Sequence, residues 1–254
     1  MKLLILFLLT VTQSFASTQF CEDINQSFKK YNWGESNCSN YDFKTYDKSI
    51  KSKDIVYTEI GDSKLDTVIV LCGVHGDEIT PVKFCFDLLK NKNSYKKYRI
   101  IVAPLVAPDS FFSIKPTRTN ANGVDVNRNF PTKDWDKFAI KKWKHNHKED
   151  KRRYPGTHSN SEVETKFQVH LIDKFKPKMI ISVHSPLSLF DYDGPQINSM
   201  GETHFGPMLL DMMSKKSKNY KVYDYPYFPG SLGNYAGYER KIPTYTLELP
   251  SSDY

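Results

Sequence analysis

In this sequence, residues whose side chains can bind a metal ion directly follow several short apolar runs. Residues 67–72 form such a run, and Gly73-Val74-His75-Gly76-Asp77-Glu78 follows at once, so that an imidazole and a carboxylate lie three residues apart. A short apolar run of this kind predicts a buried strand. A catalytic zinc ion needs two or three nitrogen or oxygen ligands from rigid elements and an open position for water. The His-x-x-Glu pair supplies two of these ligands, although its spacing alone is of low specificity.

Two further strand ends carry the same kinds of side chain. Residues 179–183 read as a buried strand that delivers His184 at its carboxyl end, and residues 245–247 deliver Glu248 in the same manner. In an open, mostly parallel sheet the ligand lies outside the carboxyl ends of the strands. We therefore expect these side chains to meet at one edge of a sheet.

Apolar runs alternate with helical patterns along the rest of the chain, and neither an internal repeat nor a low-complexity linker interrupts them. This alternation predicts an α/β fold with a mixed, mostly parallel twisted sheet and helices on both faces. We expect one catalytic domain over residues 55–254. We expect helices over residues 79–89 and 162–175, and a third helix that begins near residue 208. Further strands are expected at residues 98–103, 222–227 and 242–249.

The N-terminal residues predict export of the protein. Lys2, an apolar run over residues 3–11 and the triplet Ser14-Phe15-Ala16 make residues 1–16 a typical cleavable signal peptide. The run is short for a membrane span, and no other part of the chain approaches about 18 apolar residues, so we expect no stable membrane anchor. A secreted, periplasmic protein is the expectation. Residues 17–54 lack strong core signals, and we expect an irregular segment there.

The chain is basic, with a formal net charge of +7, which becomes +6 when the signal and its one charged side chain, Lys2, are removed. Basic side chains cluster at residues 141–144 and 151–153 and would favour an anionic surface, although a solvated loop explains them as well. His145 and His147, in the same charged stretch, are expected to be solvated. No nucleic-acid motif is present, and export argues against such a partner.

The four cysteines allow disulfides in an exported chain. Cys21 and Cys38 flank the weakly patterned N-terminal segment, and a bridge between them would hold it in place. Cys72 and Cys85 are expected in the core, one at a strand end and one on the following helix, as small apolar side chains.

Longer phrases extend the first motif. Arg118 precedes Gly123-Val124-Asp125-Val126-Asn127-Arg128-Asn129-Phe130-Pro131, and Glu248 lies within Thr246-Leu247-Glu248-Leu249-Pro250. Together with His75-Gly76-Asp77-Glu78, these phrases resemble the zinc metallocarboxypeptidase family, and most of all its bacterial branch of murein peptide amidases and murein carboxypeptidases. The resemblance covers roughly residues 55 to 250.

The resemblance implies a role for each motif residue. His75, Glu78 and His184 would hold one Zn2+ per chain, and Glu248 would act as general base and then as general acid. Arg118 would stabilise the developing oxyanion, and Asn127 with Arg128 would bind a free carboxylate at the end of the substrate. Taken without the other motifs, Asn127 and Arg128 would be read as residues that satisfy a turn.

Two parts of the family pattern fit less cleanly. A tyrosine upstream of the base covers the substrate in digestive relatives, and here four tyrosines compete for that position, namely Tyr225, Tyr227, Tyr235 and Tyr238. Asp191 and Asp193 could meet an ammonium group of the substrate, but we read them first as turn formers. Gly230-Ser231-Leu232-Gly233-Asn234 resembles a glycine-rich segment of the murein branch, where backbone could approach the substrate.

The resemblance implies hydrolysis of an amide bond beside a free carboxylate in a peptidoglycan-derived peptide, with the bond between γ-D-glutamate and diaminopimelate as the first candidate. A D,L- or L,D-carboxypeptidase that acts on another bond of the same stem peptide is an alternative, and so is an N-acyl amino acid amidohydrolase. A wall-binding protein without activity would need neither the zinc ligands nor Glu248. The sequence fixes neither stereochemical preference nor oligomeric state.

Overall fold

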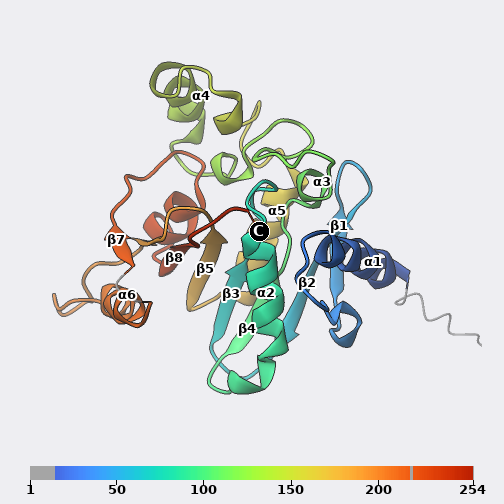
Figure 1. Cartoon of the computed structure of the whole chain (residues 1–254). Helices are drawn as coiled ribbons and strands as arrows, with labels where there is room; N and C mark the ends of the chain where they lie inside the picture. Colours follow the sequence, from blue (N-terminus) through green and yellow to red (C-terminus); the bar gives the residue numbers. More distant parts are fainter. Residues whose placement is uncertain (1–14, 218–219, 254) are drawn as a thin grey trace, which may run out of the picture.

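The computed structural model describes residues 15–217 and 220–253, and within them it contains one mixed sheet of eight strands (Figure 1). The strands follow the order β1-β2-β4-β3-β5-β8-β6-β7 across the sheet. Their bounds are β1 (Lys44–Lys48), β2 (Asp54–Ile60), β3 (Thr67–Leu71), β4 (Arg99–Ala103), β5 (Met179–His184), β6 (Leu189–Asp193), β7 (Lys221–Tyr223) and β8 (Thr244–Glu248).

The pairing of the strands confirms the predicted mixed, mostly parallel sheet. Four neighbouring pairs are parallel, namely β3 with β4, β3 with β5, β5 with β8, and β6 with β7. The other three pairs are antiparallel. The central strands β4, β3, β5 and β8 all run in one direction, so their carboxyl ends meet at one edge of the sheet.

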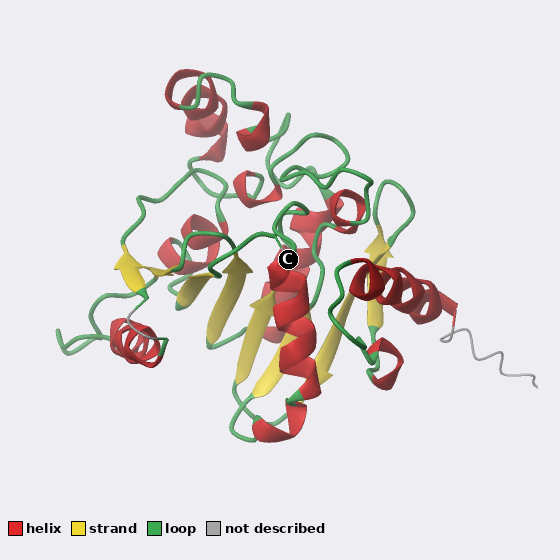
Figure 2. Cartoon of the chain, in the orientation of Figure 1, coloured by secondary structure: helices red, strands yellow, loops and turns green. Residues whose placement is uncertain are grey.

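Helices cover both faces of this sheet, as predicted (Figure 2). One core contains side chains of α1, α2 and α6, and the core on the opposite face contains side chains of α5 and of a π-helical turn, η5. The α-helices are α1 (Phe15–Lys30), α2 (Thr80–Lys90), α3 (Pro108–Phe111), α4 (Trp135–Asn146), α5 (Val163–Phe175) and α6 (Phe205–Lys216), and the shorter turns include η1 (Cys38–Asn40), η3 (Val126–Arg128), η4 (Lys151–Arg153) and η5 (Gly233–Tyr238).

The N-terminal segment, residues 17–54, is not irregular as expected. It contains most of α1, the turn η1 and the edge strand β1. Phe20, Ile24 and Phe28 recur every four residues and are 0–2% exposed, which is the apolar stripe of a helix that packs on a core. The stripe is short and lies among polar residues, so a search for longer apolar runs misses it.

The basic segment, residues 141–153, also differs from the expected loop. It forms the end of helix α4 and the turn η4, which lie beyond the sheet in Figure 1. Trp135 and Ala139 are buried on one side of α4, whereas most of its lysines face outward. The segment has few apolar residues among many charged ones, so its sequence pattern did not predict a helix.

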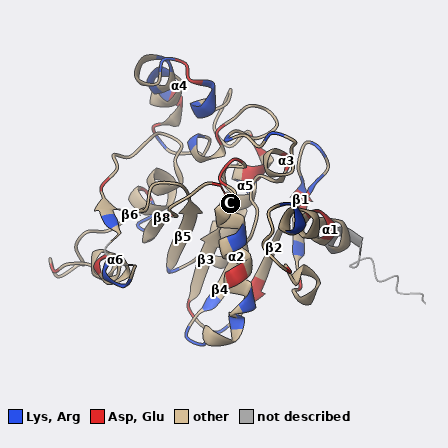
Figure 3. Cartoon of the chain, viewed as in Figure 1, with Lys and Arg blue, Asp and Glu red and all other residues tan. Residues whose placement is uncertain are grey.

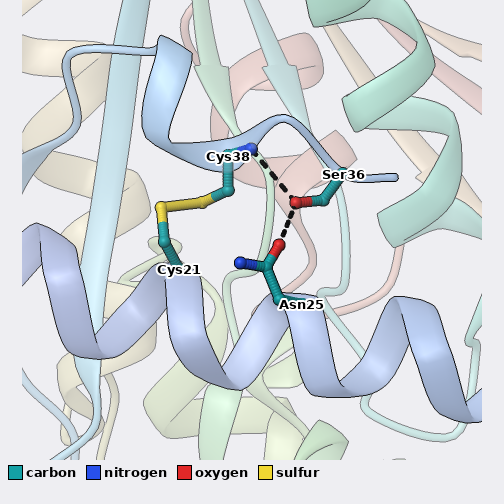
Figure 4. The surroundings of a disulfide bond; sticks show 4 residues. All are labelled: Cys21, Asn25, Ser36 and Cys38. Atoms are coloured by element: carbon teal, nitrogen blue, oxygen red, sulfur yellow. Dashed lines mark hydrogen bonds between the residues drawn. A yellow bond between two sulfur atoms is a disulfide. The ribbon is translucent and has the colours of Figure 1, made fainter. Parts of the chain in front are cut away.

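The predicted disulfide between Cys21 and Cys38 is confirmed (Figure 4). It joins α1 to η1, with 5.4 Å between the two Cα atoms. Ser36 donates its hydroxyl to the side-chain oxygen of Asn25 on α1 and accepts a hydrogen bond from the amide of Cys38. A covalent bond and a hydrogen-bonded link therefore hold the same loop against the helix.

Residues 1–14, which make up most of the predicted signal peptide, lie outside the described residues, so the signal remains a prediction. Among the helices that the structure describes, none is both long and apolar enough to cross a membrane.

We predict that replacing Cys21 and Cys38 together by serine lowers the free energy of unfolding by about 3 kcal/mol, because the bridge closes a short loop in the unfolded chain. In a chain of this length, that loss corresponds to a decrease of roughly 6 to 12 °C in Tm. Calorimetry of the double variant measures it, with Ser39→Ala as the control on the exposed side of η1. An unchanged Tm would contradict a stabilising role for this bridge.

Candidate active site

The three residues predicted to bind a metal converge at the carboxyl edge of the sheet. The Nδ1 atom of His75 lies 2.7 Å from Oε1 of Glu78, and the Nδ1 atom of His184 lies 2.8 Å from Oε2 of the same carboxylate. One candidate ligand atom from each residue lies within 4.8 Å of the others, and all three side chains are buried. Two nitrogens and one carboxylate in this arrangement form the donor set of a catalytic zinc site.

The second nitrogen of each imidazole has a partner of its own. Nε2 of His75 lies 3.2 Å from Oδ1 of Asp125, and Nε2 of His184 lies 2.9 Å from the hydroxyl of Ser182. Such contacts fix the ring orientation of a metal-ligating histidine and leave its other nitrogen free for the metal. The sequence analysis missed both partners. The signal for Ser182 was its position two residues before His184, which places both on the same side of strand β5.

The loop between β3 and α2 brings His75 and Glu78 to this position. Gly76 lies so close to the backbone of Ser110 and Phe111 that a side chain there would collide with it. The amide of Asp77 donates to the carbonyl oxygen of Thr117 at 3.1 Å. The chain can therefore turn tightly after the strand and present both ligands from one short loop.

A second disulfide closes the same loop, in contrast to our expectation of two unpaired cysteines. Cys72 directly follows β3 and Cys85 lies on α2, at the positions predicted, but the two are bonded, with 6.3 Å between their Cα atoms. The sequence could not show this pairing because it depends on how α2 packs back against the end of β3. Both His75 and Glu78 lie inside the ring that the bond closes.

Glu248 stands beside the metal ligands on the neighbouring strand. In the parallel pair of β5 and β8, Glu248 is the register partner of His184. Its Oε2 atom is buried and has no hydrogen-bond partner among the described residues. Burial, with the negative charge of Glu78, raises the pKa of Glu248 above its usual value. A carboxylate that lies beside the candidate metal ligands and keeps a free oxygen has the properties of a general base.

Arg118 also reaches the metal-binding carboxylate. Its Nη1 atom donates to Oε1 of Glu78 at 3.3 Å, and its Nε atom donates to Oδ2 of Asp125 at 2.9 Å. Asp125 is fully buried. Although burial opposes ionisation, the Arg118 and His75 charges hold the pKa of Asp125 well below its usual range. The guanidinium is thus fixed beside the carboxylate of Glu78.

Asn127 and Arg128 lie in the turn η3, which Asp125 stabilises by accepting a hydrogen bond from the amide of Asn127 at 3.0 Å. The Nε atom of Arg128 is buried and has no hydrogen-bond partner among the described residues, and the guanidinium lies 4.7 Å from the ring centre of Phe228. Burial lowers the pKa of Arg128 to about 10. A guanidinium with an unused donor can accept a carboxylate ligand.

All seven predicted site residues line one cavity of about 220 Å³. The alternating side chains of β5, β8 and β6 form its floor, because each strand turns the same face toward it. In this register, Thr246 of β8 lies between Ser182 of β5 and Asp191 of β6, and Thr244 lies beside Asp193. The structure therefore adds acidic and hydroxyl side chains to the metal site.

Asp191 and Asp193 are strand residues of β6 and not turn formers, contrary to our first interpretation. Burial raises the pKa of Asp191 to about 6 and that of Asp193 to about 8. Gly233 leaves room for the carboxylate of Asp193, which a side chain at position 233 would displace. The sequence Leu-Phe-Asp-Tyr-Asp alternates with a period of two, and this was the signal for a strand.

The structure separates the four candidate tyrosines. Tyr225 lines the cavity. Tyr235 is buried in the core and packs on the ring of Phe130, whereas Tyr227 and Tyr238 stack on each other with 4.6 Å between ring centres. Among these four, Tyr225 is therefore the one placed to cover a bound substrate.

Comparison with known proteins identifies the family. The profile of the zinc carboxypeptidase family matches residues 35–253, and the chain belongs to this family of hydrolases. The chain is 28% identical over 218 residues to murein peptide amidase A of Vibrio campbellii, which covers 81% of this chain and 78% of that protein. It is 27% identical over 213 residues to murein peptide amidase A of Escherichia coli K12, with 82% of each chain covered.

Solved structures show the same fold. The murein-tripeptide amidase from Escherichia coli O157 superposes with a TM-score of 0.60 at 23% identity, over 83% of this chain and 84% of that one. Bovine thrombin-activatable fibrinolysis inhibitor, solved with a tick carboxypeptidase inhibitor, gives a TM-score of 0.64 at 19% identity, over 92% and 84% of the two chains.

We predict that Asp125→Asn lowers the affinity for zinc about 10- to 100-fold, because His75 loses the carboxylate that orients its ring. Competition with a chromogenic chelator measures the affinity. Asp136→Asn is the matched control, since Asp136 is exposed on α4. Equal affinities of the two variants would show that Asp125 does not support the metal site.

Proposed function

We propose that this chain is an exported, zinc-dependent amidase that hydrolyses an amide bond beside a free carboxylate in peptidoglycan stem peptides. The bond between γ-D-glutamate and diaminopimelate is the first candidate. One observation carries this proposal: a single cavity joins the metal triad and Glu248 to a cationic end, at Arg128, and an acidic floor, at Asp191 and Asp193. Such a cavity suits a leaving amino acid that has both a free carboxylate and a distal ammonium group.

The donor set fits zinc, which His75 Nδ1, Glu78 and His184 Nδ1 would hold. When bound, zinc would lower the pKa of water toward neutrality and polarise the substrate carbonyl. The three side chains are buried and oriented by their neighbours, as a catalytic site requires. Two disulfides among the described residues support export, because such bonds persist mainly in oxidising compartments.

The chain's own residues account for the proton transfers. Glu248 takes a proton from the attacking water and then gives it to the nitrogen of the leaving amine as the amide bond breaks. The raised pKa of Glu248 suits both steps, since the carboxyl group must carry the proton between them. Arg118 faces the carbonyl oxygen with a fixed positive charge and so stabilises the oxyanion that develops there.

The cationic end of the cavity restricts the enzyme to a bond beside a free carboxylate. The amide of Asn127 is tied to Asp125, and its side-chain oxygen accepts a hydrogen bond from the amide of Leu232 at 2.8 Å. Its side-chain NH2 group and the unused Nε–H of Arg128 can then both donate to a carboxylate. A substrate without a free carboxylate at this position would leave the Nε–H donor of Arg128 unpaired.

The acidic floor favours the murein peptide over the alternatives. An N-acyl amino acid amidohydrolase with apolar substrates has no use for two buried acids, whereas the distal amine of diaminopimelate would offset their burial. Murein peptide amidases are also the curated relatives to which the chain is similar. A D,L- or L,D-carboxypeptidase remains the alternative within the same substrate class, because the cavity alone does not select the bond.

We predict that Glu248→Gln retains about one zinc per chain and loses at least about 100-fold in kcat, because it removes only the proton carrier. His75→Ala should lose the metal. Elemental analysis gives the zinc content, and mass spectrometry of digested muropeptides gives the bond that is cut. Glu35→Gln, on the exposed surface, is the matched control. Full activity of metal-free protein would refute the zinc site.

We predict that KM for a diaminopimelate peptide falls as the pH rises from about 6 to about 8. Burial raises the pKa of Asp191 to about 6 and that of Asp193 to about 8, so Asp191 is half ionised at the lower end of this range, Asp193 is half ionised at the upper end, and the negative charge of the pair grows between them. Only the ionised form attracts an ammonium group. A peptide with 2-aminopimelate, which lacks the distal amine, is the control and should show no such dependence.

The variant Asp193→Asn tests the assignment of that dependence. It should flatten the pH profile of KM for the diaminopimelate peptide toward that of the control peptide. If both peptides respond to pH alike in the wild type, then the two acids do not bind the amine.

A further inference from the structure

A third arginine, Arg153, lines the active-site cavity, and neither the zinc chemistry nor the terminal carboxylate site uses it. Arg118 is already paired with Asp125 and Glu78. Arg153 has one ion pair among the described residues, in which its Nε atom lies 3.6 Å from Oδ2 of Asp150. The side chains of Arg153 and Asp150 are 43% and 42% exposed, so solvent weakens this pair.

The turn that carries Arg153 is connected to the site on both sides. The preceding residue, Arg152, donates from Nη1 to Oδ2 of Asp77 at 2.7 Å, in the loop that carries the metal ligands. On the other side, the amide of Asp125 donates to the carbonyl oxygen of Tyr154 at 2.8 Å. Asp150 also caps the turn by accepting from the amide of Arg152 at 2.9 Å. The backbone at Arg153 is therefore tied to the site, and its partly exposed side chain reaches the cavity.

Arg153 adds a like charge to a wall of the cavity that is already cationic. Arg128, Arg153 and Phe228 line both this cavity and a second, small hollow, which Lys142 and His147 also line. Figure 3 shows the ribbon of α4 coloured blue at its basic positions. The charges of Arg128 and Arg153 oppose each other, which destabilises both unless an anion lies between them or beside them. The terminal carboxylate of a substrate can satisfy Arg128 but leaves Arg153 with only its long, solvent-weakened pair with Asp150.

We propose that Arg153 is a specificity-determining residue that binds a second carboxylate of the substrate, separate from the one at Asn127 and Arg128. This inference rests on the proposed function. Two groups of a stem peptide have the required chemistry, namely the free α-carboxylate of a γ-linked glutamate and the distal carboxylate of diaminopimelate. A planar guanidinium binds either one through two parallel hydrogen bonds.

The proposal explains how the enzyme would reject ordinary peptides. A peptide of neutral residues offers one free carboxylate, at its C-terminus. A stem peptide offers more than one close to the scissile bond, so the second arginine gains its partner only with this class of substrate. Specificity of this kind depends on a charged group that is left unpaired by the wrong ligand.

The experiment compares three synthetic peptides on the zinc-loaded enzyme. These are L-Ala-γ-D-Glu-diaminopimelate, the same peptide with the glutamate α-carboxylate amidated, and the same peptide with lysine in place of diaminopimelate. Each is tested with wild type, Arg153→Gln and Lys151→Gln, the last being a control from the same turn that does not line the active-site cavity. Calorimetric titration of the three peptides into Glu248→Gln, with and without Arg153→Gln, adds a measure of binding that is independent of turnover.

We expect Arg153→Gln to lower kcat/KM for the parent peptide about 10- to 100-fold, mainly through KM, which corresponds to the loss of one charge-assisted contact. One of the two analogues lacks the carboxylate that Arg153 binds, and we expect Arg153→Gln to leave kcat/KM for that analogue unchanged. The analogue that shows no loss therefore identifies the carboxylate. Lys151→Gln should behave as the wild type does. The titrations should show the same pattern in Kd.

Equal losses on all three peptides, or no loss on any, would overturn the role of Arg153 while leaving the amidase function in place. Wild-type enzyme that cleaves none of the peptides would instead overturn the proposed function, and the inference about Arg153 would fail with it. Arg153→Lys separates charge from shape, since it should restore part of the affinity only if the contact is ionic.

Discussion

The buried carboxylate of Asp125 connects all the working parts of this site. It meets the imidazole of His75, pairs with Arg118, and accepts a hydrogen bond from the amide of Asn127. Its own amide holds the segment that carries Arg153, through Tyr154. A charge buried this deeply is tolerated only when it is paired and fully hydrogen-bonded, so the surrounding loops must keep their places for the network to exist. His75, Arg118 and the turn that carries Asn127 and Arg128 are thereby fixed relative to one another.

The sheet supplies the other half of the site, and the positions of these side chains depend on the register of its strands. Because β5, β8 and β6 pair in register, Ser182 and His184, Glu248 with its two threonines, and the two acids of β6 all face one cavity. A register shift of one residue in any of these pairings would move the side chains of that strand to the opposite face of the sheet. The tightly packed cores on both faces of the sheet oppose such a shift, and the buried disulfide between Cys72 and Cys85 ties the end of β3 to α2.

The distribution of charge in the cavity gives the site its selectivity. Cationic side chains and acids with raised pKa values line the same cavity. Each group carries a cost in the empty site, through burial or through like-charge repulsion, and a ligand with the complementary charges removes it. A substrate with several carboxylates and one amine fits this pattern better than a neutral peptide does.

The sequence by itself determined the class of fold, and it predicted that His75, Glu78, His184, Glu248, Arg118, Asn127 and Arg128 come together, because each of them lies at a strand end or within a distinctive phrase; the structure places all of them around one cavity. Local patterns also placed Cys72 and Cys85 correctly, one at a strand end and one on a helix. The tertiary structure alone decided that these cysteines are bonded, that Ser182 and Asp125 orient the histidines, and that Asp191, Asp193 and Arg153 reach the cavity. The physical reason is that such contacts join residues far apart in the chain. Their formation depends on strand register and on the packing of helices against the sheet, and neither is encoded in the spacing of a single segment.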